Sequence, residues 1–166
     1  MGQDNQNKVL KLFYEHPDTG FTVREISKLA KMPRATVHKY LVELKKTGLV
    51  NNKNKASSNL FFRTKKINYF IEKIVECGFI DFIIQELNPS LVILFGSIRK
   101  GDSVKESDID LFIESHMKKK VNLGKYEKKL GHKIQLFVEE DINNLQENLF
   151  NNVINGIKLY GSLKIK

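Results

Sequence analysis

The residues best suited to chemistry lie within residues 91–113, where a glycine-serine pair is followed by two closely spaced aspartates. Residues 91–95 are all apolar and rich in strand formers, which predicts a strand buried on both faces. The strand ends at Gly96, where the missing Cβ lets the backbone turn sharply and lets a ligand approach closely. Ser97 then falls in the first turn of a helix, where unpaired backbone N–H groups can face an anion. This pair is therefore suited to binding phosphate.

The two aspartates, Asp108 and Asp110, open a second predicted strand over residues 108–113. In a strand, residues i and i+2 project from the same face, so these carboxylates lie side by side, with backbones about 7 Å apart. Neighbouring carboxylates repel each other unless a cation lies between them, and Mg²⁺ is commonly bound by a few carboxylates together with phosphate oxygens. The pattern thus predicts a site for a triphosphate with Mg²⁺ (or Mn²⁺).

These residues follow one order: glycine-serine, three residues, a glycine, a short gap and serine-aspartate-x-aspartate. This order resembles the signature of the minimal nucleotidyltransferases of the DNA polymerase β superfamily. The resemblance is tight over residues 91–113 and looser over residues 79–166. It implies that Asp108 and Asp110 are catalytic residues that bind the metal. The residues it assigns to the nucleotide are Gly96, Ser97, Gly101 and Ser107. The alternative is an aspartate-rich turn that opens a strand after a glycine that merely ends the previous one.

One position departs from the family pattern. The family places a third acidic residue in the next strand, predicted over residues 133–138, and the matching position here is Gln135. An amide oxygen can touch a metal ion but brings no charge. Because the third acid is thought to help activate the nucleophile, we expect its loss to impair turnover more than nucleotide binding. The alternative is that Gln135 faces the other side of the sheet.

The charge of the chain is concentrated in its first two-fifths. The whole chain carries a net charge of +9, and residues 1–66 hold 14 basic and 5 acidic residues, which accounts for all of it. Residues 67–166 hold 14 of each. This asymmetry predicts two domains, the first of which faces a polyanion.

The basic segment has the pattern of a helix-turn-helix. A first helix is predicted before Pro17, and Thr22 with Glu25 forms a capping box for a second helix over residues 23–30. A third helix follows over residues 33–47 and stops at Gly48. Two short apolar runs, residues 49–50 and 60–62, flank a polar loop, which predicts a β-hairpin wing.

These features resemble the winged helix-turn-helix regulators of prokaryotes over most of residues 5–66, which implies that double-stranded DNA is a partner. The third helix would enter the major groove, and other lysines would contact phosphates. The expected DNA-binding residues on the third helix, for bases or phosphates, are Arg34, Thr36, His38 and Lys39. The expected phosphate contacts are Lys45, Lys46, Lys53 and Lys55. The alternative is a small helical domain used for protein contacts.

The expected architecture is a two-domain α/β (α+β) chain. Residues 1–66 form the winged helix-turn-helix, residues 67–78 a linker helix, and residues 79–166 a small nucleotidyltransferase-type mixed sheet with flanking helices. After the third strand, one or two final helices are predicted within residues 145–160. The linker helix suggests a homodimer, because such helices often join winged-helix subunits.

The first functional hypothesis is a DNA-binding nucleotidyltransferase that transfers a nucleoside monophosphate from an NTP to a hydroxyl. We expect the NTP to be ATP, and a protein is one candidate acceptor. The second is a transcriptional regulator or antitoxin-like protein whose nucleotidyltransferase domain is inactive and serves for nucleotide sensing or dimerisation. No apolar run approaches the ~20 residues of a membrane span, and the single Cys77 fits a reducing cytoplasm, so we expect a cytoplasmic protein without a membrane partner.

Overall fold

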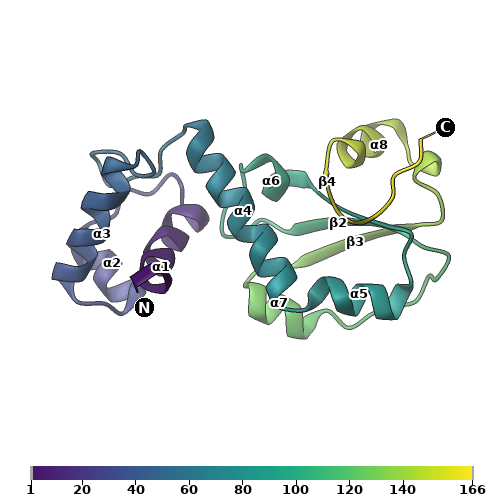
Figure 1. Ribbon diagram of the computed structural model, residues 1–166, viewed down its shortest axis with the longest axis horizontal. Coiled ribbons are helices and arrows are strands. Elements are labelled where there is room, and N and C mark those ends of the chain that lie inside the picture. The colour runs from purple at the N-terminus through teal and green to yellow at the C-terminus, as the bar shows by residue number, and fades with distance from the viewer. Residues whose placement is uncertain (1, 166) are drawn as a thin grey trace. The chain divides into compact units, whose positions relative to one another are not determined.

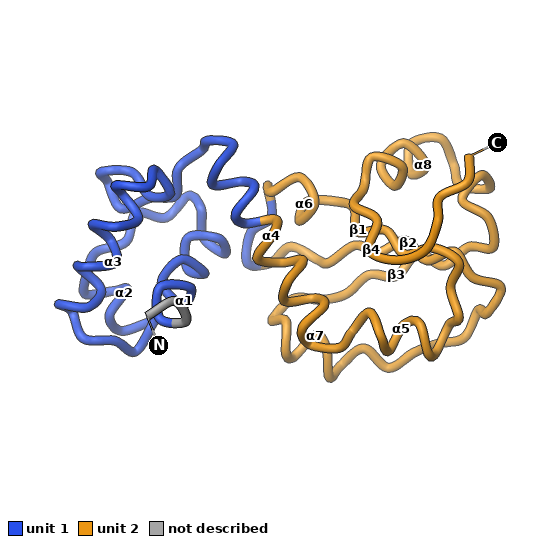
Figure 2. The backbone as a smooth tube through the Cα atoms, viewed as in Figure 1, with its two compact units in different colours: residues 1–66, 103–105 blue, residues 67–102, 106–166 orange. Residues whose placement is uncertain are grey.

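The computed structural model of the protein describes residues 2–165 (Figure 1), which form two compact units (Figure 2). Unit 1 comprises residues 1–66 and 103–105, and unit 2 comprises residues 67–102 and 106–166. The division falls inside helix α4 (Leu60–Glu76). Within residues 2–165, no helix combines the length and the apolar character that crossing a membrane requires.

Unit 1 is a helical bundle with a short wing. Its helices before α4 are α1 (Gly2–Glu15), α2 (Val23–Ala30) and α3 (Arg34–Lys46). The predicted capping box begins α2: Thr22 Oγ1 accepts from the backbone N–H of Glu25, and the Glu25 carboxylate accepts from that of Thr22. Lys31, with φ of 53°, makes the tight turn into α3. The three buried apolar residues on α3, Val37, Leu41 and Leu44, hold it in the bundle.

The wing differs from the sequence prediction. A single bridge joins Val50 to Ala56, and the apolar run of residues 60–62, which we predicted as the second wing strand, forms the first turn of α4. The cause is Asn59, whose side-chain oxygen accepts from the backbone N–H of Phe62, 2.8 Å away, as an N-cap does. The Asn59 amide also donates to the carbonyl of Gly48, 2.8 Å away. Helix α4 therefore starts earlier than the helix predicted from residue 67.

Unit 2 is built on a mixed sheet, and within the described residues its strand order is β3-β2-β1-β4. Strands β1 (Leu91–Phe95) and β2 (Ile109–Glu114) are antiparallel, and β2 is parallel to β3 (Ile134–Glu139). The remaining elements are α5 (Phe79–Leu87), α6 (Gly96–Lys100), α7 (Gly124–Leu130), the 3₁₀ turn η1 (Ile142–Asn144), α8 (Glu147–Ile154) and β4 (Ile157–Gly161). This arrangement confirms the predicted α+β fold class.

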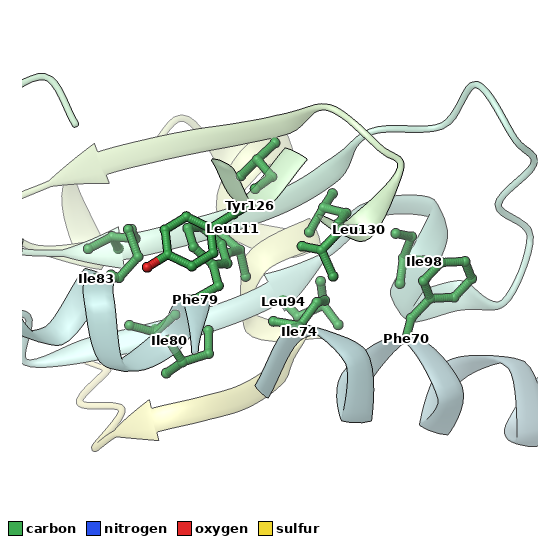
Figure 3. Packing of buried hydrophobic residues seen from close by; sticks show 14 of the residues in the cluster. Phe70, Ile74, Phe79, Ile80, Ile83, Leu94, Ile98, Leu111, Tyr126 and Leu130 are labelled. Atoms are coloured by element: carbon green, nitrogen blue, oxygen red, sulfur yellow. The ribbon is translucent and has the colours of Figure 1, made fainter. Parts of the chain in front are cut away.

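Two apolar clusters cover the two faces of the sheet. Helices α5 and α7 and the second half of α4 pack on one face, where Phe79, Leu111 and Tyr126 are among the buried residues (Figures 1 and 3). On the other face, Phe112 packs with Val153 of α8. All five residues of β1 are buried, as a strand between two such layers requires.

The end of the chain also differs from the prediction. We predicted helices alone within residues 145–160, whereas α8 stops at Ile154 and the chain turns back as β4 beside β1. The turn passes close to β1 at Gly156, where an added Cβ would lie 2.3 Å from Ile93 Cγ2 and 2.7 Å from the carbonyl oxygen of Leu94. Pairing with β4 satisfies backbone groups of β1 that would otherwise face an open edge.

Candidate functional site

The turn after β1 carries the predicted phosphate-binding pair. Gly96 has φ of 73°, a backbone conformation that side chains rarely adopt, and it starts α6 directly after the buried strand. Ser97 follows in the first turn, and Ile98 anchors α6 in the apolar core. Gly101 ends this short helix with φ of 75°. The glycine-serine pair is thus held by a rigid strand on one side and a buried isoleucine on the other.

Strand β2 brings an aspartate to this turn. Asp110 is the cross-strand partner of Phe95, the last residue of β1, and its carboxylate occupies the space beside the Gly96 Cα. Burial, and secondly the charge of Asp108, raise the pKa of the Asp110 carboxyl above its ordinary value. Asp108 is exposed and directly precedes β2.

These two carboxylates fit a divalent cation. Burial first, and then the charge of Asp108, make ionisation of Asp110 costly and raise its pKa, so a cation between the two carboxylates would offset that cost. Mg²⁺ is typically held by one or two carboxylates and by substrate phosphates. Asp108 and Asp110 could therefore hold the ion, with Gly96 and Ser97 at the phosphates.

Gln135 lies next to this pair. It is the register partner of Asp110 on the parallel strand β3, so both side chains leave the same face of the sheet. The next residues on that face, Phe112 and Phe137, pack in one apolar cluster, which gives the same assignment independently. Gln135 is exposed. The structure therefore places a neutral, exposed amide beside Asp110 on the same face of the sheet.

The acidic residues at the end of β3 and after it lie at the wrong end of the strand to supply a third carboxylate there. Glu139 pairs with Glu114, four residues along the ladder from the Asp110–Gln135 pair, which is about 13 Å by strand rise. Among residues 2–165, no cluster of three or more His, Cys, Asp or Glu side chains is arranged to hold a metal ion. Within the described part of the chain, the site thus rests on two carboxylates.

Ser107, which directly precedes Asp108, contacts His132. The Ser107 carbonyl oxygen lies 2.7 Å from Nδ1 of His132, a buried side chain that follows α7. We did not predict a role for His132, because a single histidine after a glycine carries no local signal. The contact joins residues 25 positions apart in the sequence, so no local pattern indicates it.

The predicted DNA-reading residues lie on α3. Arg34, His38 and Lys39 are exposed, whereas Thr36 is half-buried. They follow the turn at Lys31, so the first turns of α3 present two cations and an imidazole to solvent. In helix-turn-helix proteins, the recognition helix presents residues of its first turns to base edges in the major groove.

The four lysines predicted to contact phosphates divide into two pairs. Lys46 and Lys53 are exposed. Lys45 Nζ is 3.5 Å from the carbonyl oxygen of Asn52 in the wing, and Lys55 Nζ is 3.2 Å from an Asp18 carboxylate oxygen. Lys45 and Lys55 therefore also tie the wing to α3 and to the turn after α1.

Comparison with protein families agrees with the geometry of both units. The family model described as Polymerase beta, Nucleotidyltransferase matches residues 79–164. The model described as IclR helix-turn-helix domain matches residues 7–53. Comparisons with curated proteins and with solved structures found no similar protein. Both sequence resemblances are thereby confirmed: a helix-turn-helix domain precedes a nucleotidyltransferase-family domain in one chain.

Proposed function

Because this chain belongs to the polymerase beta nucleotidyltransferase family, we propose that it binds an NTP with Mg²⁺ in unit 2, and DNA through α3 and the wing in unit 1. The observation that carries the first half is the close approach of Asp110 to Gly96, next to a second carboxylate, Asp108. It brings candidate metal ligands to the turn that would receive phosphate. ATP is the first nucleotide to test.

The reaction that this site supports is transfer of a nucleoside monophosphate to a hydroxyl. The acceptor oxygen bonds to the α-phosphorus, the bond from that phosphorus to the leaving pyrophosphate breaks, and the hydroxyl proton passes to a base. When bound, Mg²⁺ would neutralise charge on the phosphates. Asp108 and Asp110 would hold the ion, and the backbone at Gly96 and Ser97 would orient the triphosphate. Gln135 has no carboxylate to take the proton, so we expect slow transfer by the wild-type protein alone.

A second candidate function follows from the same residue. A site with two carboxylates and an amide binds a nucleotide without rapid turnover, which suits a DNA-binding regulator that senses a nucleotide. The neutral Gln135 at the register position of Asp110 favours this function. The proposal also includes a protein as the acceptor and a homodimer as the assembled state, and binding experiments test both.

Two measurements on the full-length protein test the proposal. Calorimetric titration with ATP and the other NTPs, with and without Mg²⁺, should show binding that strengthens with Mg²⁺ and weakens in Asp108→Asn. Ser97→Ala should weaken it less, because one neutral hydrogen bond contributes ~1 kcal/mol. Incubation with α-labelled ATP and cell extract then separates transfer, seen as label on an acceptor, from sensing. If ATP affinity is the same with and without Mg²⁺, the metal assignment is wrong.

A further inference from the structure

His132 is a buried polar side chain in the turn that connects α7 to β3. Gly131 ends α7 with φ of 73°, and β3 begins at Ile134. The imidazole is 5% exposed, and its ring meets the Phe70 ring edge to face, with centroids 5.3 Å apart. A buried imidazole is costly unless its polar atoms are hydrogen-bonded, so the partner that it holds is informative.

The partner is the backbone just before a candidate metal ligand. His132 Nδ1 is 2.7 Å from the carbonyl oxygen of Ser107, and because a carbonyl can only accept, Nδ1 carries the hydrogen and donates. The next residue contributes a second bond: the backbone N–H of Ile109 donates to the carbonyl of Lys133, 2.8 Å away. Two consecutive residues therefore fix the backbone on both sides of Asp108.

Asp108 needs such support more than Asp110 does. Asp110 lies inside β2, where ladder bonds to β1 and β3 set its direction. Asp108 precedes β2, and its side chain is exposed, so its direction depends on the backbone around it. Two carboxylates bind one cation more tightly when both are held in the required geometry before the ion arrives.

We propose that His132 is a positioning residue, which directs the Asp108 carboxylate toward Asp110 through its hydrogen bond to the Ser107 carbonyl. This inference rests on the proposed binding of an NTP with Mg²⁺. His132 lies outside the glycine-serine and aspartate motifs. Its proposed role is to strengthen the part of the nucleotide affinity that depends on Mg²⁺.

Substitutions at this position separate the donor from the ring. His132→Asn keeps an N–H close to the position of Nδ1, whereas His132→Phe keeps a flat ring against Phe70 and removes the donor. His132→Gln places its N–H one bond further out, and replaces the phenylalanine variant if that protein does not fold. Ile83→Val, a small core change in α5, is the matched control for lost stability.

The experiment measures ATP affinity of the full-length protein with and without Mg²⁺, together with hydrogen exchange of the Ile109 amide without ligand. We expect His132→Phe to lose about tenfold of the Mg²⁺-dependent gain in affinity, equivalent to about 1.4 kcal/mol, and to exchange the Ile109 amide faster. His132→Asn and Ile83→Val should keep the gain. ATP binding without Mg²⁺ should be similar in all of them.

Each other outcome contradicts the proposal. If His132→Phe keeps the full Mg²⁺-dependent gain, His132 is structural only, while the proposed nucleotide site stands. If His132→Asn loses as much as His132→Phe, the donated hydrogen bond is not what matters. If the wild-type protein shows no Mg²⁺-dependent binding, the proposed function fails and the role of His132 fails with it.

Discussion

The Asp110 carboxylate fills the space that a side chain on Gly96 would need. A Cβ built on Gly96 would overlap Oδ2 of Asp110 and would lie 2.9 Å from its Cγ. Gly96 and Asp110 are therefore one packed unit. Their separation in sequence hides a contact that neither motif reveals alone.

Gly96→Ala should disable the site. The new methyl would displace the Asp110 carboxylate, and a φ of 73° adds about 1–2 kcal/mol of strain for a residue with a Cβ. We expect loss of Mg²⁺-dependent ATP binding in calorimetry and a lower melting temperature. Gly124→Ala, at a glycine with more space around it, is the control. Unchanged ATP binding in Gly96→Ala would show that Asp110 does not contribute to the site.

Asp110→Asn should stabilise the protein in the absence of metal while it weakens metal binding. The pKa of Asp110 is raised by burial and by Asp108, so at neutral pH its ionised form costs folding free energy. Because the carboxylate is partly exposed, we expect less than about 1 kcal/mol, or a rise of roughly 1–3 °C in melting temperature at pH 7. The gain should shrink as the pH falls through the raised pKa, where wild-type Asp110 becomes protonated.

Addition of Mg²⁺ and ATP completes that test. The wild-type melting temperature should rise on addition, and that of Asp110→Asn should rise less. A variant that melts lower than wild type at pH 7 without Mg²⁺ would mean that the carboxylate already has a stabilising partner.

Sequence patterns predicted the elements that depend on local signals. The capping box at Thr22 and Glu25 predicted the start of α2, and the apolar run of residues 91–95 predicted β1 with its bounds. Both signals are complete within a few neighbouring residues. The α+β fold class and both family resemblances followed from signals of this kind.

Long-range contacts explain what the sequence did not predict. Residues 60–62 have the composition of a strand, but Asn59 caps them as a helix while its amide donates to the carbonyl of Gly48, 11 positions earlier. The segment that forms β4 has no strong strand signal, and its pairing depends on the close approach at Gly156. Likewise, the Asp110–Gln135 register and the His132 hydrogen bond join elements that only the folded sheet brings together.

Arg34→Ala and Lys53→Ala should weaken DNA binding in different ways. Arg34 lies at the first turn of α3, where it can read a guanine, and its loss should cost about 1–3 kcal/mol on a specific site and less on random DNA. Lys53 lies in the wing and should contact phosphate, so its loss should weaken both kinds of DNA alike and reduce the salt dependence. The specific DNA is a binding sequence selected by the protein from a pool of random DNA sequences.

Gel shifts of the full-length protein at several salt concentrations make this comparison. Lys158→Ala, an exposed lysine on β4 in unit 2, is the control and should bind like wild type. Equal losses for Arg34→Ala on specific and random DNA would remove the proposed base contact.

Glu127→Gln should make stability less dependent on pH. The Glu127 carboxylate accepts hydrogen bonds from the backbone N–H of Ile134 and from Nζ of Lys133. These bonds, the first of them most strongly, lower the pKa of Glu127 below the usual 4.5. A lowered pKa stabilises the fold above the unfolded-state pKa, and this contribution is lost as the pH falls through the folded-state value. We expect the variant to melt slightly lower at pH 7 and the difference to vanish in acid. A constant difference across this range would exclude the ionised carboxylate as its cause.

The replacement of Gln135 by an acid tests whether a third carboxylate beside Asp108 and Asp110 strengthens Mg²⁺ binding and transfer. Gln135 is exposed and shares a sheet face with Asp110, so a carboxylate there joins the pair without being buried. Gln135→Asp should strengthen Mg²⁺ binding in the presence of ATP by about tenfold, or ~1.4 kcal/mol, and should raise transfer of label from α-labelled ATP. Gln135→Glu should have a smaller effect, because the resemblance to the nucleotidyltransferases implies the shorter aspartate side chain at this position.

The sign of the change in melting temperature decides between a metal site and mere repulsion. Without Mg²⁺, a third negative charge beside Asp108 and Asp110 should lower the melting temperature of Gln135→Asp, and Mg²⁺ should restore it. Gln85→Glu, an exposed change on α5, should respond to neither. If Mg²⁺ fails to restore Gln135→Asp, the three side chains do not share a cation. Rapid labelling of an acceptor by the wild-type protein would instead show that a base other than residue 135 takes the proton.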